Sequence, residues 1–252
     1  MEQAEFIQTK YGDLAAGGWS PRLRKRFGYL SPDDRYEMHV ADTVTAGTDW
    51  LDVGCGRLLF PGNMGLAAQL AARCRSLGGI DPSPNIQENT LLQHRAQCSL
   101  EAYAPDRQFD LITMRMVVEH ISDPDAAVAA LGRLTRPGGK VVIYTVNKWS
   151  PVSLASAATP TAVHLAAKRI LWGGEDRDTF PTAYKMNTRS ALQRLMAANN
   201  FSEAAFDYLP DTRTLAQFRA GAWAELALWR SLRTMGIMYP ENCLLGTYVR
   251  GP

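Results

Sequence analysis

The sequence has few cysteines, no long hydrophobic run and no recognisable leader. Its four cysteines, Cys55, Cys74, Cys98 and Cys243, are scattered over 252 residues without a Cys-x-x-Cys pair. This spacing favours neither a zinc site nor a disulfide framework. No apolar stretch approaches the length of a membrane span, and the first ten residues, MEQAEFIQTK, lack the apolar core of a signal peptide. We therefore expect a cytoplasmic protein without a transmembrane segment.

A strong excess of charge is also absent. The formal net charge is +2, with 46% hydrophobic and 21% charged residues, which is typical of an ordinary globular protein. Such a balance gives no electrostatic reason to expect a nucleic-acid partner. The one local exception is RLRKR at residues 22–26, which is either a solvated turn or a site for a ligand carboxylate. The length favours one large domain, or one domain with a cap.

From residue 48 to 147, short apolar runs alternate with helical patterns. Strands are predicted at 49–53, 77–81, 97–101, 109–114 and 140–146, helices at 64–77, 84–93 and 123–135, and a turn at 137–139. This alternation predicts βαβ units and a parallel sheet covered on both faces. Residues 149–188 have the composition of an insertion that covers a site, followed by a helix at 190–199, a strand at 201–208, a helix at 215–235 and a strand at 244–250.

The glycine turn after the first strand lacks the third glycine of a dinucleotide fingerprint. Asp52-Val53-Gly54-Cys55-Gly56 is followed by Arg57 and Leu58. A G-x-G-x-x-G pattern would bring a pyrophosphate to the helix N-terminus, and this spacing does not provide it. The two glycines serve either the turn alone or a different ligand that approaches the backbone closely. An NAD-dependent oxidoreductase is therefore disfavoured.

Three further features fall at predicted strand ends, where open α/β sheets bind ligands. Asp81 ends the second strand and could accept both hydroxyls of a ribose. Ser99 and Leu100 end the third and could contact an adenine ring. The block Phe109–Ile143 places Arg115, Met116, Glu119 and His120 at the mouth of the fourth.

Taken together, these motifs resemble those of the class I S-adenosylmethionine-dependent methyltransferases. The similarity runs from the 52–56 turn through Asp81, Phe109-Asp110-Leu111-Ile112 and Val118-Glu119-His120-Ile121 to Leu134–Lys140, and it is greatest to the ubiquinone-biosynthesis O-methyltransferases. It implies an α/β, Rossmann-like, doubly wound, seven-stranded and mostly parallel sheet with an inserted helical cap. It also implies an N-terminal helical segment or lid over residues 1–47 and a methyltransferase domain over 48–252, with the substrate cap at about 149–188.

The resemblance implies a role for each site residue. Asp52, Gly54, Cys55 and Gly56 would line the methionine part of S-adenosylmethionine. Asp81 would hold the ribose, with Ile80 and Pro82 beside the adenine. Ser99 and Leu100 would lie at the adenine edge, and Arg115 and Met116 under the sulfonium. The product would be S-adenosylhomocysteine.

Two departures from the family pattern bear on the chemistry. Leu58 stands near the expected third glycine, which leaves the path of the loop open. In the ubiquinone-type enzymes two glutamates and a histidine hold a divalent metal; Glu119 and His120 match two of these, but Met116 stands in place of the first glutamate. Because hard cations prefer several oxygen ligands, we expect no essential metal.

The expected reaction is methylation of a small molecule at a hydroxyl, the acceptor being a natural product, a sugar or a lipid-like molecule. His120 is the candidate catalytic base, since imidazole titrates near neutral pH; it could instead organise the turn after the fourth strand. Candidate substrate contacts are Tyr11, Trp19, Arg22, Trp149, Asp178 and Tyr184.

Other functions remain open at this level. The same fold could methylate nucleic acid, but the residues from Arg115 to Val118 lack the Pro-Pro-aromatic motif of several base-methylating enzymes, and we expect no nucleic-acid partner. A non-catalytic S-adenosylmethionine-binding module is a second alternative. Residues 161–172 could form a helix that contacts a membrane surface. The chain is expected to be a monomer or a homodimer.

Overall fold

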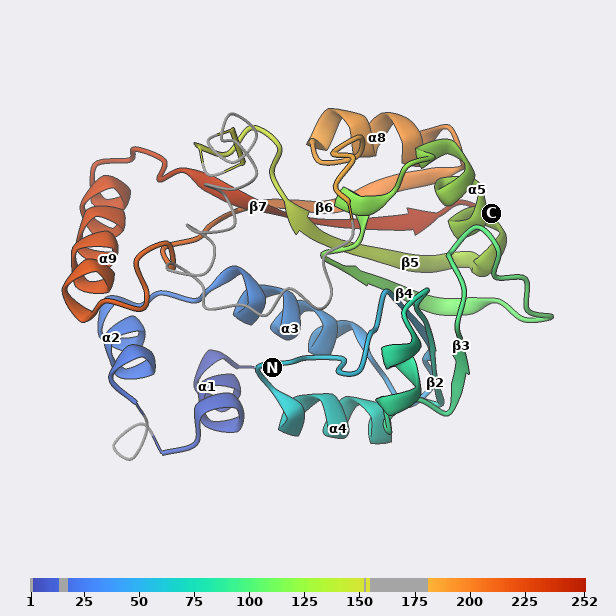
Figure 1. Cartoon of the computed structure of the whole chain (residues 1–252), viewed down its shortest axis with the longest axis horizontal. Helices are drawn as coiled ribbons and strands as arrows, with labels where there is room; N and C mark the ends of the chain where they lie inside the picture. The colour runs from blue at the N-terminus through green and yellow to red at the C-terminus, as the bar shows by residue number, and fades with distance from the viewer. Residues whose placement is uncertain (1, 14–17, 152, 155–180) are drawn as a thin grey trace.

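The computed structural model describes residues 2–13, 18–151, 153–154 and 181–252. These residues form a seven-stranded sheet in the order β3-β2-β1-β4-β5-β7-β6 (Figure 1). Its strands are β1 (Asp49–Val53), β2 (Ser76–Ile80), β3 (His94–Ala96), β4 (Phe109–Arg115), β5 (Thr135–Val146), β6 (Phe201–Pro210) and β7 (Glu241–Arg250). The helices described are α1 (Gln3–Tyr11), α2 (Trp19–Phe27), α3 (Pro32–Thr43), α4 (Met64–Arg73), α5 (Pro124–Leu134), α8 (Arg189–Ala197) and α9 (Arg219–Thr234).

The sheet is doubly wound and mostly parallel, as predicted. β1 pairs in parallel with both β2 and β4, and the strand order reverses between these two pairings. β7 runs antiparallel between β5 and β6. In such sheets a ligand crevice opens beyond the carboxyl ends of the strands at the reversal point. The topology therefore places the candidate site at the ends of β1, β2 and β4.

Two apolar layers cover the sheet because successive strand residues point to opposite faces. Trp50 packs on one side with Tyr36 of α3 and Leu70 of α4. Its neighbour Leu51 packs on the other side with Leu131 of α5. All five residues of β1 are buried, as expected of a central strand covered on both faces.

Ion pairs join helices α1 and α3, which precede β1, and a hydrogen bond links α3 to the start of α4. Lys10 of α1 lies within 2.9 Å of carboxylate oxygens of both Asp34 and Glu37 of α3, and its side chain is 7% exposed. Asn63, which caps α4, donates to the same Glu37 carboxylate at 2.9 Å. The Ser31 hydroxyl and the Asp34 carboxylate complete a capping box at the start of α3. The N-terminal segment is thus packed against the sheet domain, and its role as a lid stays a prediction.

The sequence pattern was wrong in four local details. Residues 97–101 do not form the predicted strand, and β3 occupies residues 94–96 instead. The residues of β3 are exposed or half-buried, so this edge strand has no hydrophobic pattern by which the sequence could reveal it. The helix predicted at 64–77 ends at Arg73 and gives way to β2. Of 84–93, only Pro84–Glu88 is helical, as a 3₁₀ turn. The turn expected at 137–139 lies inside β5, where Gly138 has φ 76° beside a register shift with β4.

Two expectations fall partly or wholly outside the described residues. The inserted cap at 149–188 includes residues 152 and 155–180, and the surface helix at 161–172 lies wholly within 155–180; the structure describes none of these residues. Within the described ranges, no helix combines the length and apolarity needed to cross a bilayer.

Candidate active site

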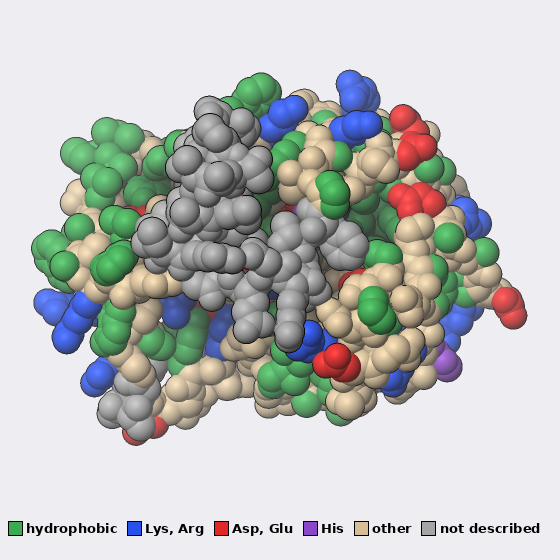
Figure 2. Space-filling model, viewed as in Figure 1, with side chains coloured by type: hydrophobic (Ala, Val, Ile, Leu, Met, Phe, Trp, Pro, Cys, Tyr) green, Lys and Arg blue, Asp and Glu red, His purple; other side chains and the backbone are tan. Residues whose placement is uncertain are grey.

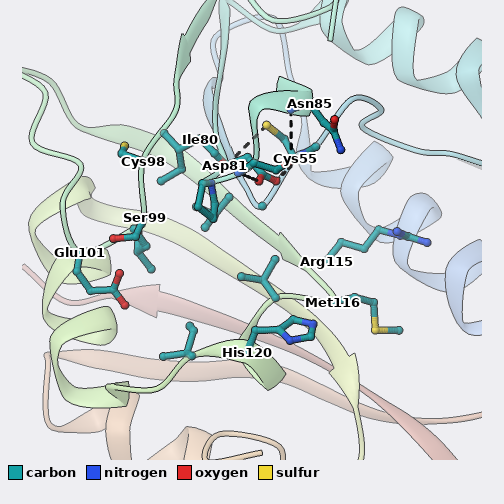
Figure 3. Close-up of a pocket in the computed structure, with 18 of the residues that line it drawn as sticks. Cys55, Ile80, Asp81, Asn85, Cys98, Ser99, Glu101, Arg115, Met116 and His120 are labelled. Carbon is teal, nitrogen blue, oxygen red and sulfur yellow. Dashed lines mark hydrogen bonds between the residues drawn. The ribbon is translucent and has the colours of Figure 1, made fainter. Parts of the chain in front are cut away.

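A cavity of about 850 Å³ opens at the carboxyl ends of β1, β2 and β4. Eleven of the twelve residues predicted to contact cofactor or to act as base line it, from four different segments of the chain. They are Gly54, Cys55, Gly56, Ile80, Asp81, Pro82, Ser99, Leu100, Arg115, Met116 and His120. Figure 3 shows Asp81 and Cys55 close together, with Arg115, Met116 and His120 across the space from them.

The turn after β1 needs glycine for two separate reasons. Gly54 and Gly56 have φ angles of 69° and 46°, a region that side chains with a Cβ rarely adopt. A Cβ on Gly54 would also overlap the Cγ2 methyl of Val117. The amide of Gly54 donates to the carbonyl of Ile80 at 2.8 Å, which ties this turn to the end of β2. Backbone is therefore exposed to the cavity without an intervening side chain.

Asp81 holds the same turn through its side chain. One carboxylate oxygen accepts a hydrogen bond from the amide of Gly56 at 2.8 Å, and the other accepts from the amide of Ser83 at 2.7 Å. The residue is 7% exposed and lines the cavity. A carboxylate oxygen can accept more than one hydrogen bond, so Asp81 retains acceptor capacity toward a ligand hydroxyl.

Cys55 contributes backbone and packing rather than a reactive thiol. Burial raises the pKa of its thiol, and the sulfur lies 3.7 Å from the carbonyl oxygen of Ile80. A Cβ added to Gly79 of the neighbouring strand would lie 2.6 Å from this sulfur. The glycine at position 79 thus makes room for the Cys55 side chain beneath the turn.

Asp52 lies beneath the cavity instead of lining it. It is 3% exposed, and the Thr113 hydroxyl donates to its carboxylate at 2.5 Å. Burial raises the pKa of Asp52 to about 7 despite that hydrogen bond. Its assignment as a cofactor contact stays a prediction. In the structure its hydrogen bond with Thr113 links the end of β1 to β4.

Arg115 joins the cavity to the N-terminal segment. Its guanidinium donates to Asp33 of α3 at 2.7 Å, and the other oxygen of Asp33 accepts from Arg213 at 2.5 Å. Burial alone would raise the pKa of Asp33, but the two guanidinium groups hold it at about 2. The next residue, Met116, has φ 53°, an unfavourable angle for a residue with a side chain. Strained backbone of this kind is concentrated at functional sites.

His120 ends a 3₁₀ turn, Val118–His120, at the mouth of β4. Its Nδ1 lies 3.1 Å from the carbonyl oxygen of Pro181. If Nδ1 carries the proton and donates a hydrogen bond to this carbonyl, Nε2 is the basic nitrogen of the ring.

Glu119 points away from the cavity and holds one of its walls. Its carbonyl oxygen accepts from the amides of Ala183 and Tyr184 at 2.7 and 3.2 Å, and its carboxylate accepts from the Thr145 hydroxyl at 2.7 Å. Burial raises the pKa of this carboxyl. Residues 181–183, which form this wall, belong to the insertion predicted at 149–188, but none of the three was predicted as a site residue. Asn85 and Glu101 also line the cavity and were not predicted as site residues.

The predicted substrate contacts lie elsewhere in the described structure. Tyr11 donates to Asp34 at 2.9 Å, and Trp19 and Arg22 belong to α2; none of the three lines the cavity. Trp149 and Tyr184 are brought together in a second cavity of about 490 Å³, which Lys148 and Lys185 also line. Asp178 falls outside the described residues. All six assignments stay predictions.

Fold and site together define a class of α/β protein whose cavity lies at the strand reversal, with a glycine turn and an acid on neighbouring strands. The chain matches the family described as "Methyltransferase domain" over residues 19–203. It belongs to that family, the S-adenosylmethionine-dependent methyltransferases of class I.

Two relatives named ubiquinone biosynthesis O-methyltransferase illustrate the similarity. The protein from Methylococcus capsulatus is 32% identical over 149 residues, covering 55% of this chain and 60% of the relative. The one from Thiobacillus denitrificans is 32% identical over 152 residues, covering 56% and 62%. The matched region thus spans about three fifths of each relative's length.

Solved structures share the fold at low identity. An S-adenosylmethionine-dependent methyltransferase from Mesorhizobium loti superposes with a TM-score of 0.56 at 15% identity, covering 87% of this chain and 98% of that one. A [4+2]-cyclase, SpnF, gives 0.52 at 17% identity, covering 86% and 81%. Because a cyclase shares the architecture, the fold alone does not fix the reaction.

Proposed function

We propose that this chain transfers the methyl group of S-adenosylmethionine to a hydroxyl oxygen of a small molecule without help from a metal ion. The observation that carries the proposal is the convergence of the 54–56 turn, Asp81, Ser99, Arg115 and His120 on one cavity. A volume of about 850 Å³ is within the range of small-molecule sites and leaves room for an acceptor beside a cofactor. The similarity to proteins named O-methyltransferases favours oxygen as the acceptor atom.

The residues present fit the cofactor. The backbone of Gly54 and Gly56 can approach a ligand closely because no Cβ intervenes. Asp81 would accept from the ribose hydroxyls, and Ser99 and Leu100 would border the adenine. The sulfonium, when bound, supplies an electrophilic methyl group. The protein has to hold the acceptor oxygen in line with that methyl group and exclude water.

His120 would remove the acceptor's proton. In the tautomer in which Nδ1 donates to the Pro181 carbonyl, Nε2 would be the basic nitrogen of the ring. A phenol, whose pKa is about 10, needs only modest assistance of this kind. Phenolic acceptors are therefore the first class to assay.

The donor set argues against a required metal ion. Met116 supplies no oxygen, and the Glu119 carboxylate is buried and bonded to Thr145. Of positions 116, 119 and 120, His120 alone offers a ligand to a cation, and within the described residues no group of three His, Cys, Asp or Glu side chains could hold one. Chelation with EDTA is accordingly expected to leave turnover unchanged.

The test measures methyl transfer and cofactor binding separately. Phenol, catechol and aliphatic alcohol acceptors are incubated with S-adenosylmethionine labelled on its methyl group, and labelled product is counted. His120→Gln is expected to lower kcat by about 10²–10⁴-fold while the Kd for S-adenosylmethionine stays unchanged. His94→Gln is the matched control, because His94 is exposed on edge strand β3 and does not line this cavity.

Two results would contradict the proposal. Tight cofactor binding without turnover on any acceptor would indicate a binding module. Turnover that survives His120→Gln intact would remove His120 as the base, while leaving the methyltransferase assignment in place.

A further inference from the structure

Helices α2 and α9 pack against each other at one end of the molecule, beside the main sheet domain (Figure 1). A small apolar cluster lies at this contact. The rings of Tyr29, just after α2, and Trp229 of α9 pack edge to face with their centroids 5.1 Å apart, and Leu226 is buried beside them. Trp223 of α9 lies edge-on to Phe27 of α2 at 6.4 Å. Tyr29, Leu226 and Trp229 are therefore buried between the two helices, whereas Trp223 lies at the edge of their contact and is 53% exposed.

The outer side of α9 and the turn after it carry large apolar side chains. Gly236, with φ 69°, ends the helix, and Ile237 and Met238 follow it, 52% and 72% exposed. The apolar residues that are more than half exposed in this region are Phe218, Trp223, Leu228, Met235, Ile237 and Met238. Single exposed apolar residues are ordinary, but a contiguous group marks an interaction site. Figure 2 shows hydrophobic side chains gathered at the end of the molecule where α9 lies.

Exposed cations lie on the same two helices. They are Arg22, Lys25 and Arg26 of α2 and Arg219, Arg230 and Arg233 of α9. Figure 2 shows Lys and Arg side chains directly below the hydrophobic group, where α2 lies. We call these six cations and the six apolar residues the α2–α9 surface.

Acids are missing from the exposed side of both helices. α2 has no acidic residue, and the only one in α9 is Glu225. Glu225 is buried, and its carboxylate accepts from the Leu215 amide at 3.0 Å and the Tyr239 hydroxyl at 3.2 Å. A chain with a net charge of only +2 therefore concentrates positive charge around one apolar patch.

We propose that the α2–α9 surface docks on an anionic lipid bilayer. Basic side chains are attracted to acidic headgroups, and apolar side chains between them enter the interface, which is the combination that peripheral membrane contact requires. A second copy of this chain is disfavoured, because a two-fold contact would bring the same cations together. Nucleic acid would use the cations but has no need of exposed Leu, Ile and Met side chains.

This surface is distinct from the segment 161–172 in which the sequence indicated membrane contact. It also does not depend on the proposed methyl transfer, because none of its residues lines the 850 Å³ cavity. Vesicle binding can therefore be present or absent whatever the reaction is.

Flotation of the full chain with vesicles tests the proposal. Vesicles of phosphatidylcholine mixed with phosphatidylglycerol are compared with vesicles of phosphatidylcholine alone, at low and at high salt. The chain is expected to float with the anionic vesicles at low salt, and to bind them more weakly at high salt because ions screen the headgroups. Binding to neutral vesicles is expected to be much weaker.

Two double variants separate the charges from the apolar side chains. Lys25→Gln with Arg26→Gln is expected to weaken binding about 25-fold, at about fivefold for each charge. Ile237→Ser with Met238→Ser is expected to weaken it about tenfold or more. Both pairs are exposed, so the variants should fold, which circular dichroism checks. Lys140→Gln with Arg194→Gln removes two exposed charges outside α2 and α9 and should leave binding unchanged.

Three outcomes would overturn the proposal. The first is no flotation with anionic vesicles, and the second is an equal loss in the control variant. The third is that light scattering shows a dimer that Ile237→Ser with Met238→Ser converts to a monomer. In that case the surface is an interface between copies.

Discussion

Replacement of Asp81 by Asn tests the centre of the cofactor site. The side chain keeps its size but loses its charge and one acceptor oxygen, so either Gly56 or Ser83 then has its amide facing an NH₂ group. A buried amide without a partner costs about 1–3 kcal/mol, so the free energy of unfolding of the ligand-free protein should fall by that amount. A hydrogen bond from a ribose hydroxyl to a charged carboxylate contributes about 1.5–3 kcal/mol, and 1.4 kcal/mol is a tenfold change in Kd. Loss of one such bond should raise the Kd for S-adenosylhomocysteine about tenfold to a hundredfold.

The assay separates the loss of a ribose contact from distortion of the turn. Calorimetric titration uses S-adenosylhomocysteine and its 2′-deoxyribose analogue on the wild type and on Asp81→Asn. If the carboxylate contacts the 2′-hydroxyl, the analogue should bind less tightly to the wild type but lose little further in the variant. Asp106→Asn, which changes an exposed acid outside this cavity, is the control. Equal losses for both ligands would mean that Asp81 only holds the turn.

Three further substitutions probe the supports of the site. Gly54→Ala adds a Cβ at φ 69° that overlaps Val117, so the free energy of unfolding measured in urea should fall by at least about 2 kcal/mol. The affinity for the cofactor should fall as well. Unchanged values would show that the turn can move freely. Lys10→Met removes the cation beside the buried Glu37 carboxylate and leaves Asp34 with Arg24 at 4.0 Å, so the free energy of unfolding should fall by about 3–5 kcal/mol. A loss well below that would show the α1 contact to be weak. Because burial raises the pKa of Asp52 to about 7, folding takes up a proton, and the free energy of unfolding should fall by on the order of 4 kcal/mol as pH rises from about 4 to 7. Asp52→Asn should remove that part of the pH dependence. If the free energy of unfolding of the variant falls with pH as steeply as that of the wild type, Asp52 is not the group responsible.

Local pattern was enough to predict most of the sheet. Strands β1 and β4 are short segments that are mainly apolar and almost wholly buried, and such segments between turn residues are typical of central parallel strands. β3 was misplaced because an edge strand of exposed residues has no apolar periodicity. The glycine turn and Asp81 could be identified because they follow strands at fixed offsets, and the topology then brings those offsets together.

Contacts between distant parts of the chain could not be predicted in this way. Asp33, Arg115 and Arg213 form one ion network although 82 and 180 residues separate Asp33 from its two partners. No spacing rule links such positions, so Arg115 was identified as a site residue without its partners. Trp149 and Tyr184 were predicted as substrate contacts from the composition of the insertion. That both line the second cavity depends on tertiary packing, which composition does not reveal.

The two sides of the main cavity are built by different means, and this difference bears on how its specificity is set. The side proposed to bind the cofactor consists of strand ends and backbone turns, whose positions follow from the sheet itself. The opposite side consists of residues 116–120 and the wall at 181–183, joined mainly through the backbone carbonyl of Glu119. Since backbone bonds do not depend on side-chain identity, the wall can accept substitutions without disturbing Asp81 or the glycine turn. Acceptor preference should therefore change with residues 181–183 while the Kd for S-adenosylmethionine stays constant, and variants such as Thr182→Val would reveal any coupling between the two sides.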